Sequence, residues 1–382
     1  MRTKLLRRYQ GFSLVELLVG MAMGVIVLLI VMQSLVVAEQ YKRTATNGTD
    51  AQINGLMALR TLESEIRMSG AGLTNGGNLC PAINTYYNGA GVTSKVGMAV
   101  KITDGATDAL NNSDTIETVY SSSLTGAAPS QIRVAMPTAS NVTRINTVSG
   151  MNTCDFVLFA AKDGSKTCSI LQVTDVANNQ LQFLTSSGQS NYNPSGGAQS
   201  ALFPAGGYTT DDVVINMGAN VDRLFRVFKD GTNDQFYLQQ ENMNAADSGC
   251  GPQDATPVLN AVSNVVNLQA QYGVAAANSQ EVSCWTGAAQ SDTGCAISTG
   301  NWSAPVAVDV KRIKAVRVAV VVRSAISEKP SSGATCDTTT VAPVSWDGGP
   351  AIRLAHVPDW QCYRYKVYQT VIPIINVIWA NT

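Results

Sequence analysis

The first 70 residues divide into a wholly apolar helical pattern and an amphipathic one. From Leu17 to Ala38 the chain has 22 consecutive residues without a charge, which span about 33 Å as a helix. The hydrocarbon core of a bilayer is about 30 Å thick, so this run is long enough to cross one. No small-residue cleavage site of the secretory type follows it, because the next residues are Glu-Gln-Tyr-Lys-Arg. We therefore expect a retained transmembrane helix.

A thinner apolar stripe continues the helical pattern beyond residue 38. Its members recur at spacings of three and four, which places them on one helix face: Ile53, Leu56, Met57, Leu59, Leu62 and Ile66. Arg60, Glu63 and Arg67 lie outside this face. The stripe predicts packing beneath the protein's own C-terminal region, and Gly70-Ala71-Gly72 predicts the end of a helix that runs over residues 12–69.

The remainder of the chain, residues 73–382, has the patterns of β-strands. Alternation is clearest from Val316 to Arg323 and recurs from Tyr363 to Gln369. Apolar runs at residues 224–228 and 235–238 flank an Asp-Gly turn and predict a hairpin. The D-x-[DN]-x-[DN]-G spacing of a calcium loop is absent there, so Asp230 and Asp234 are expected to form a turn.

Two less regular regions complete the pattern. Pro257–Val274 is expected to begin as a short helix and end as a strand. Residues 191–210 and 247–257 are rich in glycine and proline, yet neither has the length or composition of a free linker. They are expected to be loops within one large head, with two lobes as an alternative.

The predicted fold class is therefore α+β, with a long N-terminal helix packed on a large β-rich head. Four segments are expected: a leader at 1–11, a transmembrane or filament-core helix at 12–38, its amphipathic continuation at 39–69, and the head at 70–382.

Composition narrows the function classes. The 26 basic and 27 acidic residues nearly cancel, which gives no electrostatic footprint for nucleic acid. Four basic residues and no acidic one precede residue 12. By the positive-inside rule, this end lies in the cytoplasm and the head lies outside.

Eight cysteines are scattered along the chain without any C-x-x-C pair, which favours disulfides in an oxidising compartment over a metal or redox motif. They are Cys80, Cys154, Cys168, Cys250, Cys284, Cys295, Cys336 and Cys362. Eight cysteines allow 105 pairings. Proximity in sequence favours Cys154–Cys168, Cys284–Cys295 and Cys336–Cys362, which leaves Cys80–Cys250.

Glu16 is the one ionisable residue near the start of the apolar run. A carboxylate at membrane depth is a functional candidate, although an interfacial group near the helix end is the alternative. The surrounding string, Gly11-Phe12-Ser13-Leu14-Val15-Glu16-Leu17, resembles the class III signal of type IV prepilins and type II secretion pseudopilins. The resemblance implies cleavage between Gly11 and Phe12 by a prepilin peptidase, N-methylation of Phe12, and pairing of Glu16 with the amine of a neighbouring subunit during assembly.

The C-terminal region has a narrower resemblance. VRVAVVVRS at residues 316–324, followed by YRYKVYQTVIPIINVIW at 363–379, resembles the end of PilW-type minor pilins, and EIRMSGAG at 65–72 also matches. Ile375 stands where that family often has arginine. Residues 80–300 match nothing specific.

Searches for other chemistry give no candidate. The sequence has no P-loop and no G-x-S-x-G motif. His356 is the only histidine, and a packed or surface role is expected for it. The basic run of Lys311, Arg312, Lys314, Arg317 and Arg323 is expected to be a solvated strand face. No catalytic residue, metal or cofactor is predicted, and the chain is not expected to be an enzyme.

The expected function is that of a minor pilin that initiates or caps a type IV pilus, in the inner membrane first and on the cell surface later. The expected partners are other minor pilins, the major pilin and the prepilin peptidase. The alternatives are a minor pseudopilin of a type II secretion system and a pilus-associated adhesin.

Overall fold

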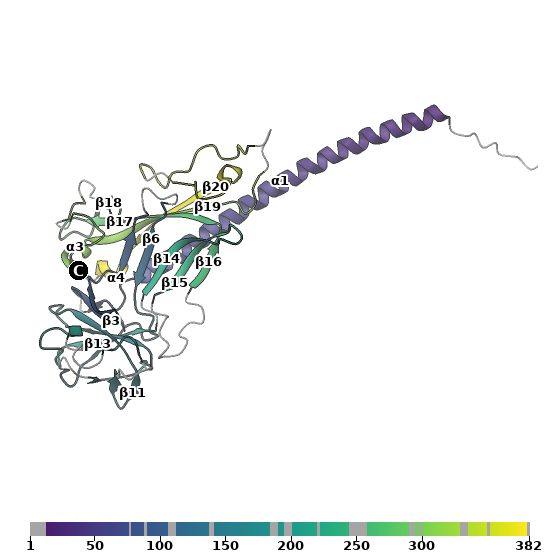
Figure 1. The fold of residues 1–382 in the computed structure, drawn as a ribbon. Helices are drawn as coiled ribbons and strands as arrows, with labels where there is room; N and C mark the ends of the chain where they lie inside the picture. Colours follow the sequence, from purple (N-terminus) through teal and green to yellow (C-terminus); the bar gives the residue numbers. More distant parts are fainter. Residues whose placement is uncertain are drawn as a thin grey trace, which may run out of the picture. The chain divides into compact units, whose positions relative to one another are not determined.

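The chain forms one long helix followed by a β-rich region, as the sequence predicts. The computed structural model describes residues 13–75, 78–87, 90–105, 112–136, 141–183, 190–194, 201–219, 222–243, 258–289, 295–297, 300–328, 335–349 and 352–379. Helix α1 spans Leu14–Met68 (Figure 1). The chain divides into two compact units, residues 1–50 and residues 51–382, so each unit contains part of α1.

The first unit contains the apolar part of α1. Its segment Leu14–Glu39 is long and apolar enough to cross a membrane. The large apolar side chains of this segment are between 49% and 80% exposed. Apolar surface on this scale is stable in water only when lipid or another protein covers it. The segment therefore has the length and surface of a membrane anchor.

The second unit contains a five-stranded antiparallel sheet in the order β16-β15-β14-β6-β5. Its strands are β5 (Val100–Thr103), β6 (Thr115–Val119), β14 (Asp222–Lys229), β15 (Phe236–Asn242) and β16 (Val258–Ser263). The predicted hairpin is confirmed as β14–β15. In its turn, the backbone N–H of Thr232 donates to Asp230 at 2.9 Å, and Asp234 pairs with Lys229 at 2.7 Å.

A four-stranded antiparallel sheet follows, in the order β18-β17-β19-β20. Its strands are β17 (Val265–Ala275), β18 (Val282–Thr286), β19 (Ile313–Arg323) and β20 (Tyr365–Pro373). The even-numbered valines of β19 face the main core, as the alternation predicts. Its other face is also buried, because Val321 packs with Ile352, Leu354 and Val357 from a later loop.

The predicted helix after residue 257 is wrong, because β16 and β17 are both strands. Asn264 between them has φ = 62°, a left-handed conformation that asparagine tolerates better than most residues. The bend directs the chain from the five-stranded into the four-stranded sheet. Apolar residues on both sides of such a bend fall at helix-like spacings, which explains the error.

A third sheet has six strands in the order β4-β3-β10-β9-β13-β7, in which only the β3–β10 pair is parallel. Its strands are β3 (Ile83–Tyr87), β4 (Gly91–Lys95), β7 (Pro129–Gln131), β9 (Phe156–Ala160), β10 (Cys168–Gln172) and β13 (Val213–Gly218). One face packs on the main core, and the other covers a second core that includes Phe159, Phe183 and Tyr208.

Smaller elements complete the fold. A three-stranded sheet contains β8 (Val142–Arg144), β11 (Asp175–Ala177) and β12 (Gln180–Gln182), and a two-stranded one contains β1 (Thr74–Asn75) and β2 (Asn78–Leu79). Short helices within the described residues include α3 (Ala307–Val310), η2 (Trp360–Cys362) and α4 (Ile375–Trp379).

In the sequence, strands β7 to β13 all lie between β6 and β14, which are neighbours in the five-stranded sheet. Strand β6 ends at Val119, and β14 begins at Asp222, which pairs directly with Val119. The intervening chain is therefore an insertion between two strands that a short turn could have joined. We call its described residues, together with β3 and β4, the inserted lobe.

Helix α1 buries a different face in the second unit from the one predicted. Leu62 and Ile66 are buried as expected, but Ile53, Leu56 and Met57 are 51%, 54% and 51% exposed. The buried face continues instead through small residues, Ala51, Gly55 and Ala58. A Cβ atom at position 55 would overlap the ring of Tyr368 on β20, so this close approach requires glycine. A search for large apolar residues misses such a face.

The disulfides agree with the sequence in part. Cys284–Cys295 and Cys336–Cys362 are confirmed. The predicted Cys154–Cys168 and Cys80–Cys250 bonds are wrong, because Cys80 is bonded to Cys168 with their Cα atoms 5.7 Å apart. The parallel β3–β10 pairing brings them together, since Ile83 lies opposite Cys168. Cys154 is also disulfide-bonded, and Cys250 lies outside the described residues.

Candidate functional site

The predicted processing segment lies at the start of α1. Glu16 is in the first helical turn, and the backbone N–H of Ser13 donates to its Oε2 at 3.4 Å. A negative charge is favoured at this end of a helix. The side chain is exposed and accessible to a cationic partner. Gly11 and Phe12 lie outside the described residues.

A buried charge cluster connects the other end of α1 to the five-stranded sheet. Arg223 Nη1 on β14 donates to Glu65 Oε1 at 2.9 Å and to Oε2 at 3.1 Å. The hydroxyl of Tyr120, which follows β6, donates to Glu65 Oε2 at 2.7 Å and also contacts Arg223. Burial is the main cause that raises the pKa of Tyr120, and its bond to Glu65 adds to it. The phenol therefore remains a hydrogen-bond donor.

The C-terminal segment caps the same end of α1. The last carbonyls of a helix have no partner within it. Asn376 on α4 supplies one, since its Nδ2 donates to the carbonyl oxygens of Met68 at 3.2 Å and Ser69 at 3.0 Å. Gly70 follows with φ = 84°, as expected of a helix C-terminus, and its N–H donates to the Val119 oxygen at 2.8 Å. The end of α1, the end of β6 and the C-terminal segment thus meet here.

Comparison with protein families gives two matches. The family described as Type IV Pilus-assembly protein W matches residues 227–376, and the one described as Prokaryotic N-terminal methylation motif matches residues 6–32. Both matches are consistent with a PilW-like type IV pilin. Comparison with curated proteins and with solved structures found no match.

The PilW-matched region extends from within β14 to Asn376 and contains the whole four-stranded sheet. The resemblance inferred from the C-terminal sequence is thereby confirmed. The helix-capping Asn376 is the last matched residue. Glu65 and the inserted lobe lie outside both matched regions.

Within the PilW-matched region, the predicted solvated basic face on β19 is wrong. Lys314 and Arg323 are each only 3% exposed, and burial lowers the pKa of both side chains. The guanidinium of Arg323 lies between the rings of Phe236 (4.9 Å) and Tyr363 (4.4 Å) and donates to the Asp234 carbonyl at 2.9 Å. Its charge is thus compensated by aromatic faces and a backbone oxygen.

Arg317 repeats this arrangement six residues earlier on the same strand. It lies over Trp285 at 5.1 Å and Trp346 at 4.4 Å, and its Nε donates to Gln271 at 2.9 Å. The planar guanidinium can stack on both faces, which an ammonium cannot do. The two arginines of the VRVAVVVRS motif therefore attach loops to the sheet. Sequence alternation found their strand but not the loops that cover it.

His356 packs in the loop that covers this sheet. Its Nε2 lies 2.9 Å from the Val266 carbonyl oxygen, and its ring lies edge-on to Phe236 at 5.5 Å. These contacts are those of a packed side chain, as expected from the sequence.

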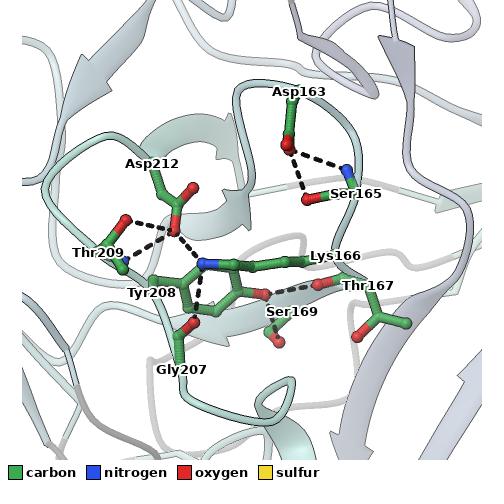
Figure 2. Close-up of polar contacts among 9 residues, drawn as sticks. All are labelled: Asp163, Ser165, Lys166, Thr167, Ser169, Gly207, Tyr208, Thr209 and Asp212. Carbon is green, nitrogen blue, oxygen red and sulfur yellow. Dashed lines mark hydrogen bonds and ion pairs between the residues drawn. The ribbon is translucent and has the colours of Figure 1, made fainter.

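The inserted lobe has a polar cluster that the sequence did not indicate (Figure 2). Lys166 Nζ donates to Asp212 Oδ2 at 2.7 Å and to the Gly207 carbonyl at 3.2 Å. The backbone N–H of Thr209 donates to the same Asp212 oxygen at 2.8 Å. The hydroxyl of Tyr208 is bonded to Ser169 at 2.8 Å. The cluster fastens the β9–β10 loop to the segment before β13, and no local spacing could reveal it.

Replacing Glu65 should destabilise the second unit strongly. Glu65→Gln leaves the Arg223 guanidinium largely buried without its anion. Loss of one partner of a buried pair costs about 3 kcal/mol or more. Urea unfolding of the full-length protein in detergent micelles, followed by tryptophan fluorescence, measures the change.

Glu63→Gln is the matched control two residues away on the same helix. Glu63 pairs with Arg67 at 2.9 Å, but the Arg67 side chain is 46% exposed. Such surface pairs contribute less than about 1 kcal/mol. Equal losses from the two variants would contradict the role assigned to Glu65.

Proposed function

We propose that this PilW-like pilin is a minor pilin of the complex that initiates or caps a type IV pilus. The observation that carries the proposal is the bulk of the second unit, which includes the inserted lobe between β6 and β14. Each subunit of a tightly packed helical fibre rises only a short distance. A subunit of this size has more room at a tip or in a small initiating complex than at every position of the shaft.

The same proposal includes processing at the N-terminus. A prepilin peptidase removes residues 1–11, and methylated Phe12 becomes the new terminus. The match over residues 6–32 supports this step. A buried charge in an apolar helix bundle needs an opposite partner. Glu16 then accepts the terminal amine of a neighbouring subunit as the helices assemble.

The proposed location is the inner membrane, with the N-terminus in the cytoplasm and residues after 38 in the periplasm. The disulfide-bonded cysteines of the second unit support an oxidising compartment for it. After assembly, the second unit lies at the pilus surface. Its partners are other minor pilins, the major pilin and the peptidase, and its role is structural and not catalytic.

A minor pseudopilin of a type II secretion system is the alternative. The description of the matched C-terminal family names pilus assembly, which favours the pilus. An adhesin would need a ligand site in residues 80–300. Among the described residues, no three His, Cys, Asp or Glu side chains are grouped to hold a metal ion.

Copy number tests the tip proposal directly. Quantitative proteomics of sheared filaments should find this chain far below the major pilin. Deletion of its gene should reduce surface pili without lowering the cellular pool of major pilin. Parity with the major pilin in the filament would place it along the shaft and refute the proposal.

Glu16 tests the pairing step. Glu16→Gln keeps the shape of the side chain but removes its charge, so the variant should be cleaved and inserted normally yet enter filaments poorly. Gln33→Ala, which replaces an uncharged polar residue in the same apolar segment, is the control and should assemble normally. Incorporation of Glu16→Gln at the wild-type level would show that the carboxylate is only interfacial.

Some residues of the apolar stripe of α1 are buried and others are exposed. The same substitution, leucine to alanine, can therefore test the role of each part. Leu62 is fully buried, so Leu62→Ala should destabilise the second unit by about 2–5 kcal/mol. Leu56 is 54% exposed, and we propose that it contacts other minor pilins. Leu56→Ala should change stability by less than about 0.5 kcal/mol but reduce co-purification of these partners. Unchanged co-purification would exclude this face as the interface.

A further inference from the structure

The base of the inserted lobe contains two carboxyl groups that face each other. Strand β6 leads into the lobe and β14 returns from it, and the two lie side by side (Figure 1). Glu117 is opposite Leu224, two residues beyond Asp222. Side chains two residues apart on neighbouring strands share a face of the sheet and lie within reach of each other. Each strand therefore contributes one carboxyl to the same face.

The other charged groups around this pair come from both sides of the sheet. Lys101 on β5 pairs with Glu117 at 3.6 Å. The positive charge of Lys95, at the end of β4 in the inserted lobe, lowers the pKa of Asp222. Arg223 points to the opposite face, where Glu65 neutralises it. The carboxyl pair thus lies where the five-stranded sheet meets the lobe.

Ionisation of both carboxyls would place two negative charges close together at half-buried positions, where they are screened less than at the surface. Burial is the largest cause that raises the pKa of Asp222 to about 8. The charge of Glu117 and its hydrogen bond raise it further, whereas Lys95 and Lys101 lower it. Two carboxyls that share a site hold one proton between them for this reason.

We propose that Glu117 and Asp222 form a proton-controlled latch at the base of the inserted lobe. With one proton between them, the hydrogen-bonded carboxyls hold the end of β6 against the start of β14. Loss of that proton makes the two groups repel, which loosens these strand ends and the attachment of the lobe.

The direction of the pH dependence follows from linkage. An unfolded aspartate titrates near pH 4, below the pKa of Asp222 in the folded chain, so the folded state binds the extra proton. The contribution of the latch to stability is therefore largest at low pH. It is lost as the pH rises from about 4 to about 8, and it is constant above that range.

Hydrogen–deuterium exchange of the full-length protein in detergent micelles tests the latch. Exchange rates at pH 6 and pH 9, corrected for the intrinsic chemical rate, report the opening of peptides from β6 and β14. Opening in the wild type should be at least about tenfold greater at pH 9. Asp222→Asn keeps the side-chain shape and a hydrogen-bond donor toward Glu117, so the wild-type increase in the opening of β14 at pH 9 should be lost.

Two control variants separate the latch from general acid effects. Asp175→Asn, at an exposed position on β11, should keep the wild-type response. Asp114 precedes β6, and burial raises its pKa to about 7, although it accepts N–H bonds from Gly105 and Ala270. Asp114→Asn should therefore alter overall stability but leave the response of β14 intact.

Two results would overturn the proposal. One is a wild-type protein whose β6 and β14 peptides open equally at pH 6 and pH 9. The other is an Asp222→Asn variant that keeps the wild-type response. If Asp222→Asn does not fold, Glu117→Gln makes the same test from the other strand.

Discussion

The close packing of α1 on the sheets of the second unit is the contact on which the remaining architecture depends. Ala51, Gly55 and Ala58 bring the helix backbone near β20, with Gly55 directly against Tyr368. One core then joins the helix to the five-, four- and six-stranded sheets. A larger side chain at position 55 would push the helix away from all three, because protein interiors are close-packed and cannot absorb the extra volume.

The end of this helix is held by segments far apart in sequence. Glu65 binds Arg223 at the start of β14, and Asn376 caps the last carbonyls from α4. A buried helix end needs such partners, since neither a charge nor a free carbonyl is tolerated there without one. The pilin-like helix and the PilW-matched region therefore complete each other. The PilW match begins at residue 227, so the expectation that residues 80–300 match nothing specific is wrong for residues 227–300.

Local sequence patterns predicted the helix and strands well, but they did not predict which other segments pack against them. The charge-free run and the glycines after Ile66 defined α1, and the Asp-Gly turn defined the β14–β15 hairpin. Alternation located β19 but could not reveal that a later loop buries its second face, together with Arg323. The Cys80–Cys168 bond depends on a parallel strand pair between distant segments. Contacts of this kind are set by topology, and spacing along the chain does not record them.

Proximity in sequence predicted two cysteine pairs correctly, at separations of 11 and 26 residues. It failed for Cys154 and Cys168, although these are closer in sequence than Cys336 and Cys362. The polar cluster of Lys166 and Asp212 in the inserted lobe could not be found in this way, since 46 residues separate the two. The same holds for the Glu65–Arg223 pair, at a separation of 158. Buried polar clusters between distant segments are therefore the features of this chain that sequence reasoning misses most readily.

The position of the inserted lobe explains how the five-stranded sheet can accommodate so long an insertion. Val119 and Asp222 are direct neighbours, so the insertion begins and ends at one point of the five-stranded sheet. The entropy cost of closing a loop grows only slowly with its length, and the β6–β14 pairing does not need to change. The lobe is not independent, however, because one face of its six-stranded sheet belongs to the main core. Its attachment therefore depends on that shared face and on the strand ends at its base, which makes the charges of Glu117 and Asp222 more consequential than their small number suggests.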